Sequence, residues 1–190
     1  MTRRSDIASL DDRLAAVRLL VLDVDGVLTN GRIEFDADGR ETKSFHVRDG
    51  LAMKAWMRSG RHLAIITGRA SLAVTARMTE LEVPFVIQGS HDKGVALERL
   101  LSETGVSAGD TAAIGDDLTD LPLLRMIGVP IAVADAAPEV REAAAWVMDE
   151  RGGDAVARVA IERMMRLSGA WDSVVSRYDS AGERAGARSG

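Results

Sequence analysis

The sequence predicts an α/β fold in which helices cover both faces of a parallel sheet, and two observations support this prediction. First, short apolar runs recur along the chain without alternating with polar residues: 19–22, 63–66, 85–87, 111–114, 130–133 and 146–148. Strands with both faces buried, as in a parallel sheet, have this composition. Second, segments between the runs carry apolar residues at helical spacing. Strands and helices that alternate in this way build a doubly wound, Rossmann-like sheet.

The helices of this fold are predicted from apolar residues that fall on one side of the segment. They cover 93–101, 118–127, 139–145 and 155–167, and the last is the longest amphipathic segment. The chain also has room for a helix before the run at 63–66 and for another before the run at 85–87.

One segment departs from this rhythm. Residues 31–47 alternate in character on either side of Asp36-Ala37-Asp38-Gly39. A short polar turn that ends in Asp-Gly between such arms predicts a β-hairpin, so we expect a hairpin flap directly after the first strand. The single domain is expected to span 1–178, and the small polar residues of 179–190 predict a disordered tail.

Composition narrows the classes of protein. The chain has 190 residues, a formal net charge of −5 and no cysteine. An acidic chain is not expected to bind nucleic acid, and the lack of cysteine excludes disulfides, thiolate metal sites and cysteine nucleophiles. The longest apolar runs are far shorter than the roughly 18 residues of a spanning helix, and the N-terminal segment does not resemble a signal peptide. We expect a soluble cytoplasmic protein without membrane contact.

Polar motifs stand at the ends of the predicted strands, where an α/β sheet places its chemistry. Asp23 and Asp25 come directly after the run at 19–22. Thr67-Gly68-Arg69 follows the run at 63–66, and Lys93 opens a predicted helix. Three further carboxylates follow the run at 111–114: Asp116, Asp117 and Asp120.

Carboxylates gathered at one sheet edge need a cation. Two unit charges 4 Å apart repel by about 4 kcal/mol at an effective dielectric near 20. Without a cation, Asp23, Asp25 and Asp116 would have raised pKa values or separated loops. A few hard oxygen ligands suit Mg²⁺, which keeps several waters and shares its coordination with phosphate. Lys93 would then supply a fixed positive charge, and Thr67 a hydroxyl donor, for phosphoryl oxygens.

Each motif also has a simpler interpretation. Asp-x-Asp-Gly and Gly-Asp-Asp are common in turns, a lysine at a helix start is commonly solvated, and Thr67 could satisfy a strand end. The context favours the functional interpretation, because all the motifs follow apolar strands in one direction along the chain.

The set of motifs resembles the haloacid-dehalogenase-type phosphatases, and longer strings resemble one branch of that superfamily. The strings are LDVDGVLTNGRI at 22–33, FHVRDGLAMK at 45–54, IITGRAS at 65–71 and IGDDLTDLPLLRMIGVPIAVADA at 114–136. They are similar to the phosphatases of 3-deoxy-D-manno-octulosonate 8-phosphate, which lack a cap domain and serve lipopolysaccharide biosynthesis. The resemblance covers about residues 18–178.

The resemblance implies a role for each motif residue. Asp23 would be the nucleophile that attacks phosphorus and forms an aspartyl-phosphate. Asp25 would protonate the leaving alcohol and then activate the hydrolytic water. Mg²⁺ would be held by the Asp23 carboxylate, the Asp25 backbone carbonyl and the Asp116 carboxylate. Thr67 and Lys93 would bind the oxygens of the transferred phosphoryl group.

Further polar residues have open assignments. Asp120 is expected to orient a metal-bound water or Lys93, and Asp117 could be a metal ligand, a support of one or a helix cap. Arg48 is expected to grip the carboxylate of a sugar acid, or else to pair with a neighbouring acid. Arg69 is expected to face the substrate or to pack on the sheet edge.

The spacing of the motifs excludes a separate cap domain. Thr67 lies 44 residues after Asp23, and Lys93 lies 26 residues after Thr67, whereas a cap would need roughly 50 residues or more. The open site must then be closed by a macromolecular substrate or by a neighbouring subunit. The resemblance implies the second, in a homotetramer whose hairpins pack together. Apolar hairpin residues fit such a flap, unless they pack on their own domain: Ile33, Phe35 and Phe45.

The predicted activity is Mg²⁺-dependent hydrolysis of 3-deoxy-D-manno-octulosonate 8-phosphate to the free sugar acid and phosphate. The alternatives are the 9-phosphate of a nine-carbon sialic-type acid, a non-catalytic binding module and a phosphoacceptor receiver domain. A binding module would be expected to lack part of the acidic set, and a receiver domain has no Asp-x-Asp-Gly after its first strand. One string departs from the family pattern, since Gly-Gly-x-Gly-Ala-Val-Arg-Glu is replaced by RGGDAVARV at 151–159.

Overall fold

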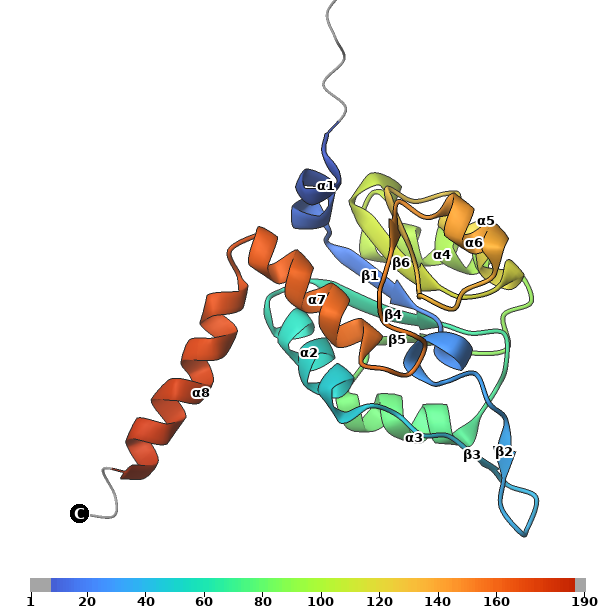
Figure 1. Ribbon diagram of the computed structural model, residues 1–190, viewed down its shortest axis with the longest axis horizontal. Coiled ribbons are helices and arrows are strands. Elements are labelled where there is room, and N and C mark those ends of the chain that lie inside the picture. Colours follow the sequence, from blue (N-terminus) through green and yellow to red (C-terminus); the bar gives the residue numbers. More distant parts are fainter. Residues whose placement is uncertain (1–7, 187–190) are drawn as a thin grey trace, which may run out of the picture.

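The computed structural model describes residues 8–186, with side chains described as far as residue 179. Its centre is a sheet of parallel strands in the order β5-β4-β1-β6-β7-β8, with helices on both faces (Figure 1). The strands are β1 (Leu19–Leu22), β4 (His62–Ile66), β5 (Phe85–Ile87), β6 (Thr111–Gly115), β7 (Val129–Ala132) and β8 (Trp146–Val147). The predicted doubly wound sheet is confirmed, and every predicted run forms a strand.

Strand β1 lies in the middle of the sheet, and all of its residues are buried. Leu22 at its end is in register with Ile65 of β4 on one side and with Ile114 of β6 on the other. Because parallel strands end at the same edge of a sheet, the segments that follow β1, β4 and β6 lie side by side. Those segments begin with Asp23, Thr67 and Asp116.

Two groups of helices cover the sheet. Helices α1 (Leu10–Ala16), α2 (Val47–Arg58) and α7 (Val156–Leu167) pack together in front of the sheet in Figure 1, and α3 (Leu72–Leu81) lies beside α2. Helix α4 (Lys93–Thr104) packs against β4, and α5 (Leu121–Leu124) packs against α4, β6 and β7. Helix α6 (Pro138–Ala143) contacts β7. The predicted helices at 93–101, 139–145 and 155–167 correspond to α4, α6 and α7.

The segment 118–127 contains less α-helix than predicted. A 3₁₀ turn, η3 (Leu118–Asp120), leads into the short α5. The side chain of Asp120 is turned back to accept a hydrogen bond from the backbone N–H of Asp116, at 2.9 Å. 3₁₀ turns are frequent at the ends of α-helices.

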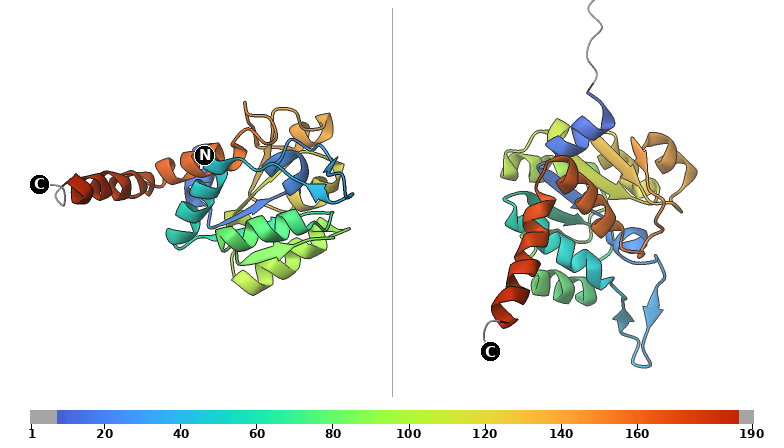
Figure 2. Two further views of the ribbon diagram at one scale, coloured as in Figure 1. Left: turned by 90° about the horizontal axis from the view of Figure 1, so that it is seen from below. Right: turned by 60° about the vertical axis from the view of Figure 1, so that its left-hand side comes forward.

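Helix α8 (Trp171–Gly186) contacts α7 and then projects from the body of the molecule (Figure 2). The composition predicted a disordered tail from residue 179, whereas the structure continues the helix to Gly186; residues 187–190 lie outside the described range. Alanine, glutamate and arginine occupy part of 179–186 and are favourable helix residues.

The predicted hairpin is confirmed. Strands β2 (Glu34–Phe35) and β3 (Glu41–Thr42) pair antiparallel, and the hairpin extends away from the sheet (Figure 1). Asp36 closes its turn by accepting hydrogen bonds from the N–H groups of Asp38 and Arg40, at 2.9 and 2.8 Å. Within residues 8–186 the chain places only the short turn at 24–28 and this hairpin between β1 and α2, and no cap domain follows any strand.

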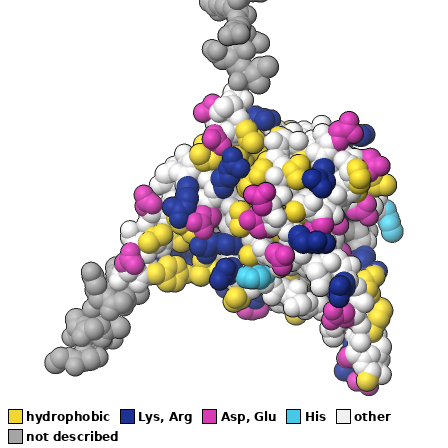
Figure 3. Space-filling model, viewed as in Figure 1, with side chains coloured by type: hydrophobic (Ala, Val, Ile, Leu, Met, Phe, Trp, Pro, Cys, Tyr) yellow, Lys and Arg dark blue, Asp and Glu magenta, His cyan; other side chains and the backbone are white. Residues whose placement is uncertain are grey.

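The apolar residues of the hairpin divide into two kinds. Ile33 and Phe35 are 50% and 63% exposed, whereas Phe45 packs against the core. Hydrophobic side chains are visible on the projecting hairpin in Figure 3. The hairpin therefore presents apolar surface to solvent in the isolated chain, while its final residues anchor it to the domain.

Two loops meet beyond the end of β1. A kinked turn, η1 (Val24–Leu28), follows Asp23, and the N–H of Gly153 donates to the carbonyl of Val27 in it, at 2.9 Å. Gly152 lies so close that a Cβ there would stand 2.0 Å from the carbonyl oxygen of Gly26. The loop before α7 thus supports the turn that carries the first acidic motif.

The buried carboxylate of Asp49 joins two helices. It belongs to α2, yet its Oδ1 accepts a hydrogen bond from the N–H of Arg158 in the first turn of α7, at 2.7 Å. Helix α2 is capped instead by His46, whose side chain accepts from the N–H of Arg48. Asp49 therefore satisfies an N-terminal donor of a helix far away in the sequence.

In the part of the chain that the structure describes, no helix has the length and apolar composition needed to cross a membrane.

Candidate active site

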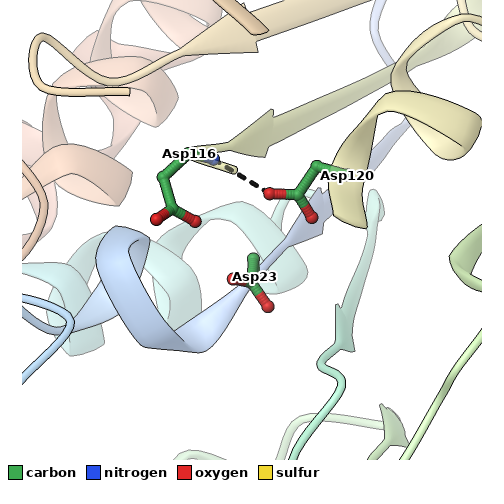
Figure 4. A group of neighbouring side chains, drawn as sticks. All are labelled: Asp23, Asp116 and Asp120. Atoms are coloured by element: carbon green, nitrogen blue, oxygen red, sulfur yellow. Dashed lines mark hydrogen bonds between the residues drawn. The ribbon is translucent and has the colours of Figure 1, made fainter. Parts of the chain in front are cut away.

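The acidic residues that the sequence placed at strand ends meet at the carboxyl edge of the sheet. Asp23 follows β1, while Asp116 and Asp120 follow β6, the neighbouring strand. One carboxylate oxygen from each of the three lies within 4.8 Å of the others (Figure 4). The carboxylate oxygens of Asp23 and Asp116 are hard donors at one edge of the sheet and match the ligand preference of Mg²⁺, so the residues present fit the predicted metal.

The electrostatics of the cluster agree with a cation site. Burial raises the pKa of Asp23 to about 6, although Lys93 opposes the shift. Burial also raises the pKa of Asp116 to about 8, and the charges of Asp23 and Asp120 add to this. A nearby positive charge favours the ionised form of a carboxylate and so opposes a raised pKa of this kind. Asp23 and Asp116 are therefore suited to hold a divalent ion at neutral pH.

Gly26 makes the close approach of Asp116 possible. Its φ of +97° lies in the region that favours glycine, and a Cβ built there would stand 2.0 Å from Asp116 Oδ2. A side chain at this position would have to displace the Asp116 carboxylate or the η1 turn. The glycine of Asp-x-Asp-Gly thus has a specific steric reason in this chain.

Lys93 stands beside the nucleophile candidate. Its side chain is buried, and its Nζ lies 2.8 Å from Asp23 Oδ1 and 2.5 Å from Asp120 Oδ1. Burial opposes the charged form, but the carboxylates of Asp23 and Asp120 raise the pKa of Lys93 overall. Asp92 caps α4 by accepting from the N–H groups of Gly94 and Val95, which fixes the helix start that carries Lys93.

Asp120 and Asp117 have different tasks. The Oδ1 of Asp120 contacts Lys93, while its Oδ2 accepts from the N–H of Asp116 at 2.9 Å. Both oxygens of Asp120 are therefore engaged with Lys93 and the acidic loop. Asp117 is exposed and accepts from the N–H of Leu118 at 2.8 Å, which is the geometry of a cap.

Asp25 points toward the hairpin. Its Oδ1 accepts a hydrogen bond from Lys43 Nζ, and its Oδ2 lies 3.7 Å from Arg69 Nε. Lys43 also lies 3.2 Å from Glu41 Oε1, and Arg69 contacts the other oxygen of Glu41. The sequence did not indicate Lys43, because a lysine in a projecting hairpin is typically solvated. The structure shows that the Lys43 side chain points inward and contacts Asp25.

The remaining predicted residues, Thr67, Arg69 and Arg48, differ in burial and in their contacts. Thr67 is buried at the end of β4, beside β1, and its backbone is held by Ile87 and Ser90. Arg69 is half-exposed at the rim and contacts Asp25. Arg48 is exposed in the first turn of α2, and no side-chain contact brings it to the cluster within residues 8–186.

Comparison with known proteins agrees with this geometry. Residues 84–159 match the model of a haloacid dehalogenase-like hydrolase family. The chain is 36% identical over 160 residues to the 3-deoxy-D-manno-octulosonate 8-phosphate phosphatase of Haemophilus influenzae, which covers 84% of this chain and 89% of that protein. It is also 36% identical to the enzyme of the same name from Escherichia coli K12, over 82% of this chain and 83% of that one.

Solved structures show the same likeness. The 3-deoxy-D-manno-octulosonate 8-phosphate phosphatase of Moraxella catarrhalis, crystallised with magnesium ion, phosphate ion and the sugar acid, superposes with a TM-score of 0.86 at 35% identity. The match covers 89% of this chain and 97% of that one. A probable phosphatase from Pseudomonas syringae is 41% identical with a TM-score of 0.85, over 89% and 96% of the two chains.

The parallel sheet with acidic residues after its first and fourth strands in chain order defines a haloacid dehalogenase-like hydrolase without a cap domain. The sequence identity to the relatives described above exceeds one third over most of this chain and most of theirs, and it points to one family within this class. The chain belongs to the family of 3-deoxy-D-manno-octulosonate 8-phosphate phosphatases.

Proposed function

We propose that this chain hydrolyses 3-deoxy-D-manno-octulosonate 8-phosphate to 3-deoxy-D-manno-octulosonate and phosphate, with Mg²⁺ as its cofactor. The observation that carries the proposal is the buried Asp23 at the end of β1, which lies 2.8 Å from Lys93 and faces Asp116. A carboxylate beside an ammonium group is placed to attack a phosphoryl group whose oxygens that ammonium group binds, and the second acid is placed to share a cation with the attacking carboxylate.

The reaction proceeds in two displacements at phosphorus. A carboxylate oxygen of Asp23 attacks phosphorus, the bond to the sugar oxygen breaks, and the departing alkoxide takes a proton from Asp25. A water that gives its proton to Asp25 then attacks the aspartyl-phosphate and releases phosphate and free Asp23. Lys93 and Thr67 bind the phosphoryl oxygens throughout, and Asp120 keeps Lys93 in place.

The metal site consists of the Asp23 carboxylate, the Asp25 backbone carbonyl and the Asp116 carboxylate. When bound, Mg²⁺ supplies the positive charge that offsets repulsion between the nucleophile and the phosphoryl group. Asp117 is assigned to capping the turn after β6 rather than to the metal, because its carboxylate accepts from the N–H of Leu118.

Arg48 and Arg69 are the proposed ligands of the sugar-acid carboxylate. The position of Arg69 at the rim, next to Asp25, supports its part, and the part of Arg48 depends on substrate reaching the start of α2. Alanine at either position should raise KM for the sugar-acid phosphate and leave KM for p-nitrophenyl phosphate unchanged. Equal effects on the two substrates would contradict the assignment.

The oligomer is proposed to be a homotetramer in which hairpins pack together and cover the open sites. The exposed Ile33 and Phe35 on the hairpin support this self-association. We also infer a cytoplasmic location, in keeping with a chain that has no cysteine. Light scattering coupled to gel filtration tests the assembly, and a fully active monomer would contradict it.

The first experiment is phosphate release from a panel of sugar phosphates, with Mg²⁺ and with EDTA. Strong preference for the eight-carbon acid phosphate, lost in EDTA and in Asp23→Asn, is the expected result. Preference for a nine-carbon sialic-type acid 9-phosphate would change the substrate and leave the mechanism intact. Full turnover by Asp23→Asn would remove the nucleophile assignment, and retention of its thermal transition is the control for folding.

A further inference from the structure

Lys43 is the most deeply buried charged side chain of the hairpin. Its side chain is 1% exposed, although the arms of the hairpin around it are mostly exposed. Burial of a lysine is unfavourable unless its ammonium group is paired and hydrogen-bonded. The Lys43 side chain points inward although it lies in a hairpin that is mostly exposed, so the contacts of its ammonium group must offset the cost of its burial.

Those contacts close a ring of alternating charges. Lys43 binds Asp25 Oδ1 and Glu41, Arg69 contacts the same Glu41, and Arg69 Nε lies 3.7 Å from Asp25 Oδ2. The side chains of Ser71, Arg69 and Lys43 keep the pKa of Glu41 low, at about 2, so Glu41 is an anion in the ring at neutral pH. Three segments meet here: the turn after β1, the hairpin, and the loop after β4.

The ring fixes the direction of the Asp25 carboxylate, because each of its oxygens faces a different cation. Of the two cations, Arg69 is 45% exposed at its side chain and Lys43 is buried. A salt bridge that is exposed contributes little to fixing a geometry, so Lys43 is the contact that determines where Asp25 lies. Anchoring the hairpin alone would not require an ammonium group on the proposed acid–base residue.

We propose that Lys43 is a positioning residue of the phosphatase reaction. It holds the carboxylate of Asp25 at the base of the hairpin, so that the position of the hairpin determines where this carboxylate lies. The inference rests on the acid–base role given to Asp25 under the proposed function. It assigns a residue of the hairpin a part in the reaction, and it makes proton transfer by Asp25 depend on the position of the hairpin.

The experiment compares two phosphate esters in rapid-mixing kinetics. The sugar-acid phosphate has a poor leaving group that needs a proton from Asp25, whereas p-nitrophenolate leaves without one; both need Asp25 for attack by water. Lys43→Met should lower kcat on the sugar-acid phosphate by about 10²-fold, the lower end of general acid–base contributions. On p-nitrophenyl phosphate, Lys43→Met should release a burst of about one p-nitrophenolate per chain, followed by a slow phase, because attack by water on the aspartyl-phosphate still needs Asp25.

The matched control is Arg40→Met, which removes one positive charge from the exposed tip of the same hairpin, 76% exposed at its side chain; it should behave like the unmodified chain. Asp25→Asn should give the same burst as Lys43→Met. If Lys43→Met lacks the thermal transition of the unmodified chain, Lys43→Gln, which keeps a hydrogen-bond donor, carries the comparison.

The outcomes separate the two proposals. A burst in Asp25→Asn without one in the Lys43 variants, or a rate of the first turnover that Lys43→Met lowers equally on both esters, overturns the role of Lys43 and leaves the proposed mechanism standing. If Asp25→Asn shows no burst and lowers the rate of the first turnover equally on both esters, the acid–base assignment of the proposed function fails.

Discussion

Replacement of Asp49 by asparagine should remove a pH-dependent destabilisation of the native state. Asp49 is 3% exposed, and burial raises its pKa to about 6 from 3.8, against the opposing hydrogen bond from Arg158. The folded protein therefore holds the Asp49 proton more tightly than the unfolded chain does. The stabilisation that this proton provides is complete below about pH 4 and is lost as the pH rises through about 6.

The magnitude follows from the displacement of this pKa. At 1.36 kcal/mol per pH unit, a change from 3.8 to about 6 corresponds to about 3 kcal/mol between the two extremes. Between pH 4 and 8, the free energy of unfolding of the unmodified protein should fall by about 2 to 3 kcal/mol relative to Asp49→Asn. Asparagine is uncharged over this range, and its carbonyl oxygen can still accept from the N–H of Arg158.

Urea denaturation of both proteins, followed by circular dichroism at several pH values from 4 to 8, measures this difference. Asp23 and Asp116 also have raised pKa values, but they titrate in both proteins and cancel in the comparison. A constant offset between the two proteins is compatible with the reasoning, because the amide replaces a carboxylate oxygen. A difference that does not change with pH, or that changes in the opposite direction, would refute it.

Further predictions concern the metal, the acidic turn and the assembly. EDTA should abolish phosphate release and added Mg²⁺ should restore it, with a higher Mg²⁺ requirement in Asp116→Asn; activity in EDTA equal to that in Mg²⁺ would contradict the metal assignment. Gly26→Ala should lower kcat by about 10²-fold, the effect of misplacing a reacting group by about 1 Å, because the new Cβ stands 2.0 Å from Asp116 Oδ2; steady-state kinetics that match the unmodified enzyme would show that the turn can yield. Phe35→Asp should convert the expected tetramer to smaller species in light scattering without changing the thermal transition of the domain, and an intact tetramer would place the interface elsewhere.

The sheet could be predicted from the sequence because its signal is local. Runs such as 19–22 and 63–66 are apolar throughout, and burial on both faces is the direct consequence of a central position in a parallel sheet. The carboxyl ends of adjacent strands then determine that Asp23 and Asp116 come together. Helix ends were less accurate, as the 3₁₀ turn at Leu118–Asp120 shows.

The parts that the sequence did not indicate depend on contacts between distant segments. Lys43 is a surface residue by its surroundings in the sequence, and it becomes buried only because Asp25 and Glu41 meet its side chain. Asp49 resembles a residue that caps its own helix, yet it caps the start of α7. Pairings of this kind are not encoded in the residues near them in sequence.

The loop before α7 has a consequence for the order in which the site is assembled during synthesis. The turn after β1 emerges early from the ribosome, but Gly153, which donates to the carbonyl of Val27 in that turn, is made much later. A contact between residues 27 and 153 closes a long loop, and the entropy cost of closing that loop must be met before the contact stabilises the turn. A nascent chain released before this loop would carry every predicted catalytic carboxylate and still lack the backbone support of the nucleophile turn, so full support of that turn is acquired only after Gly153 has been made.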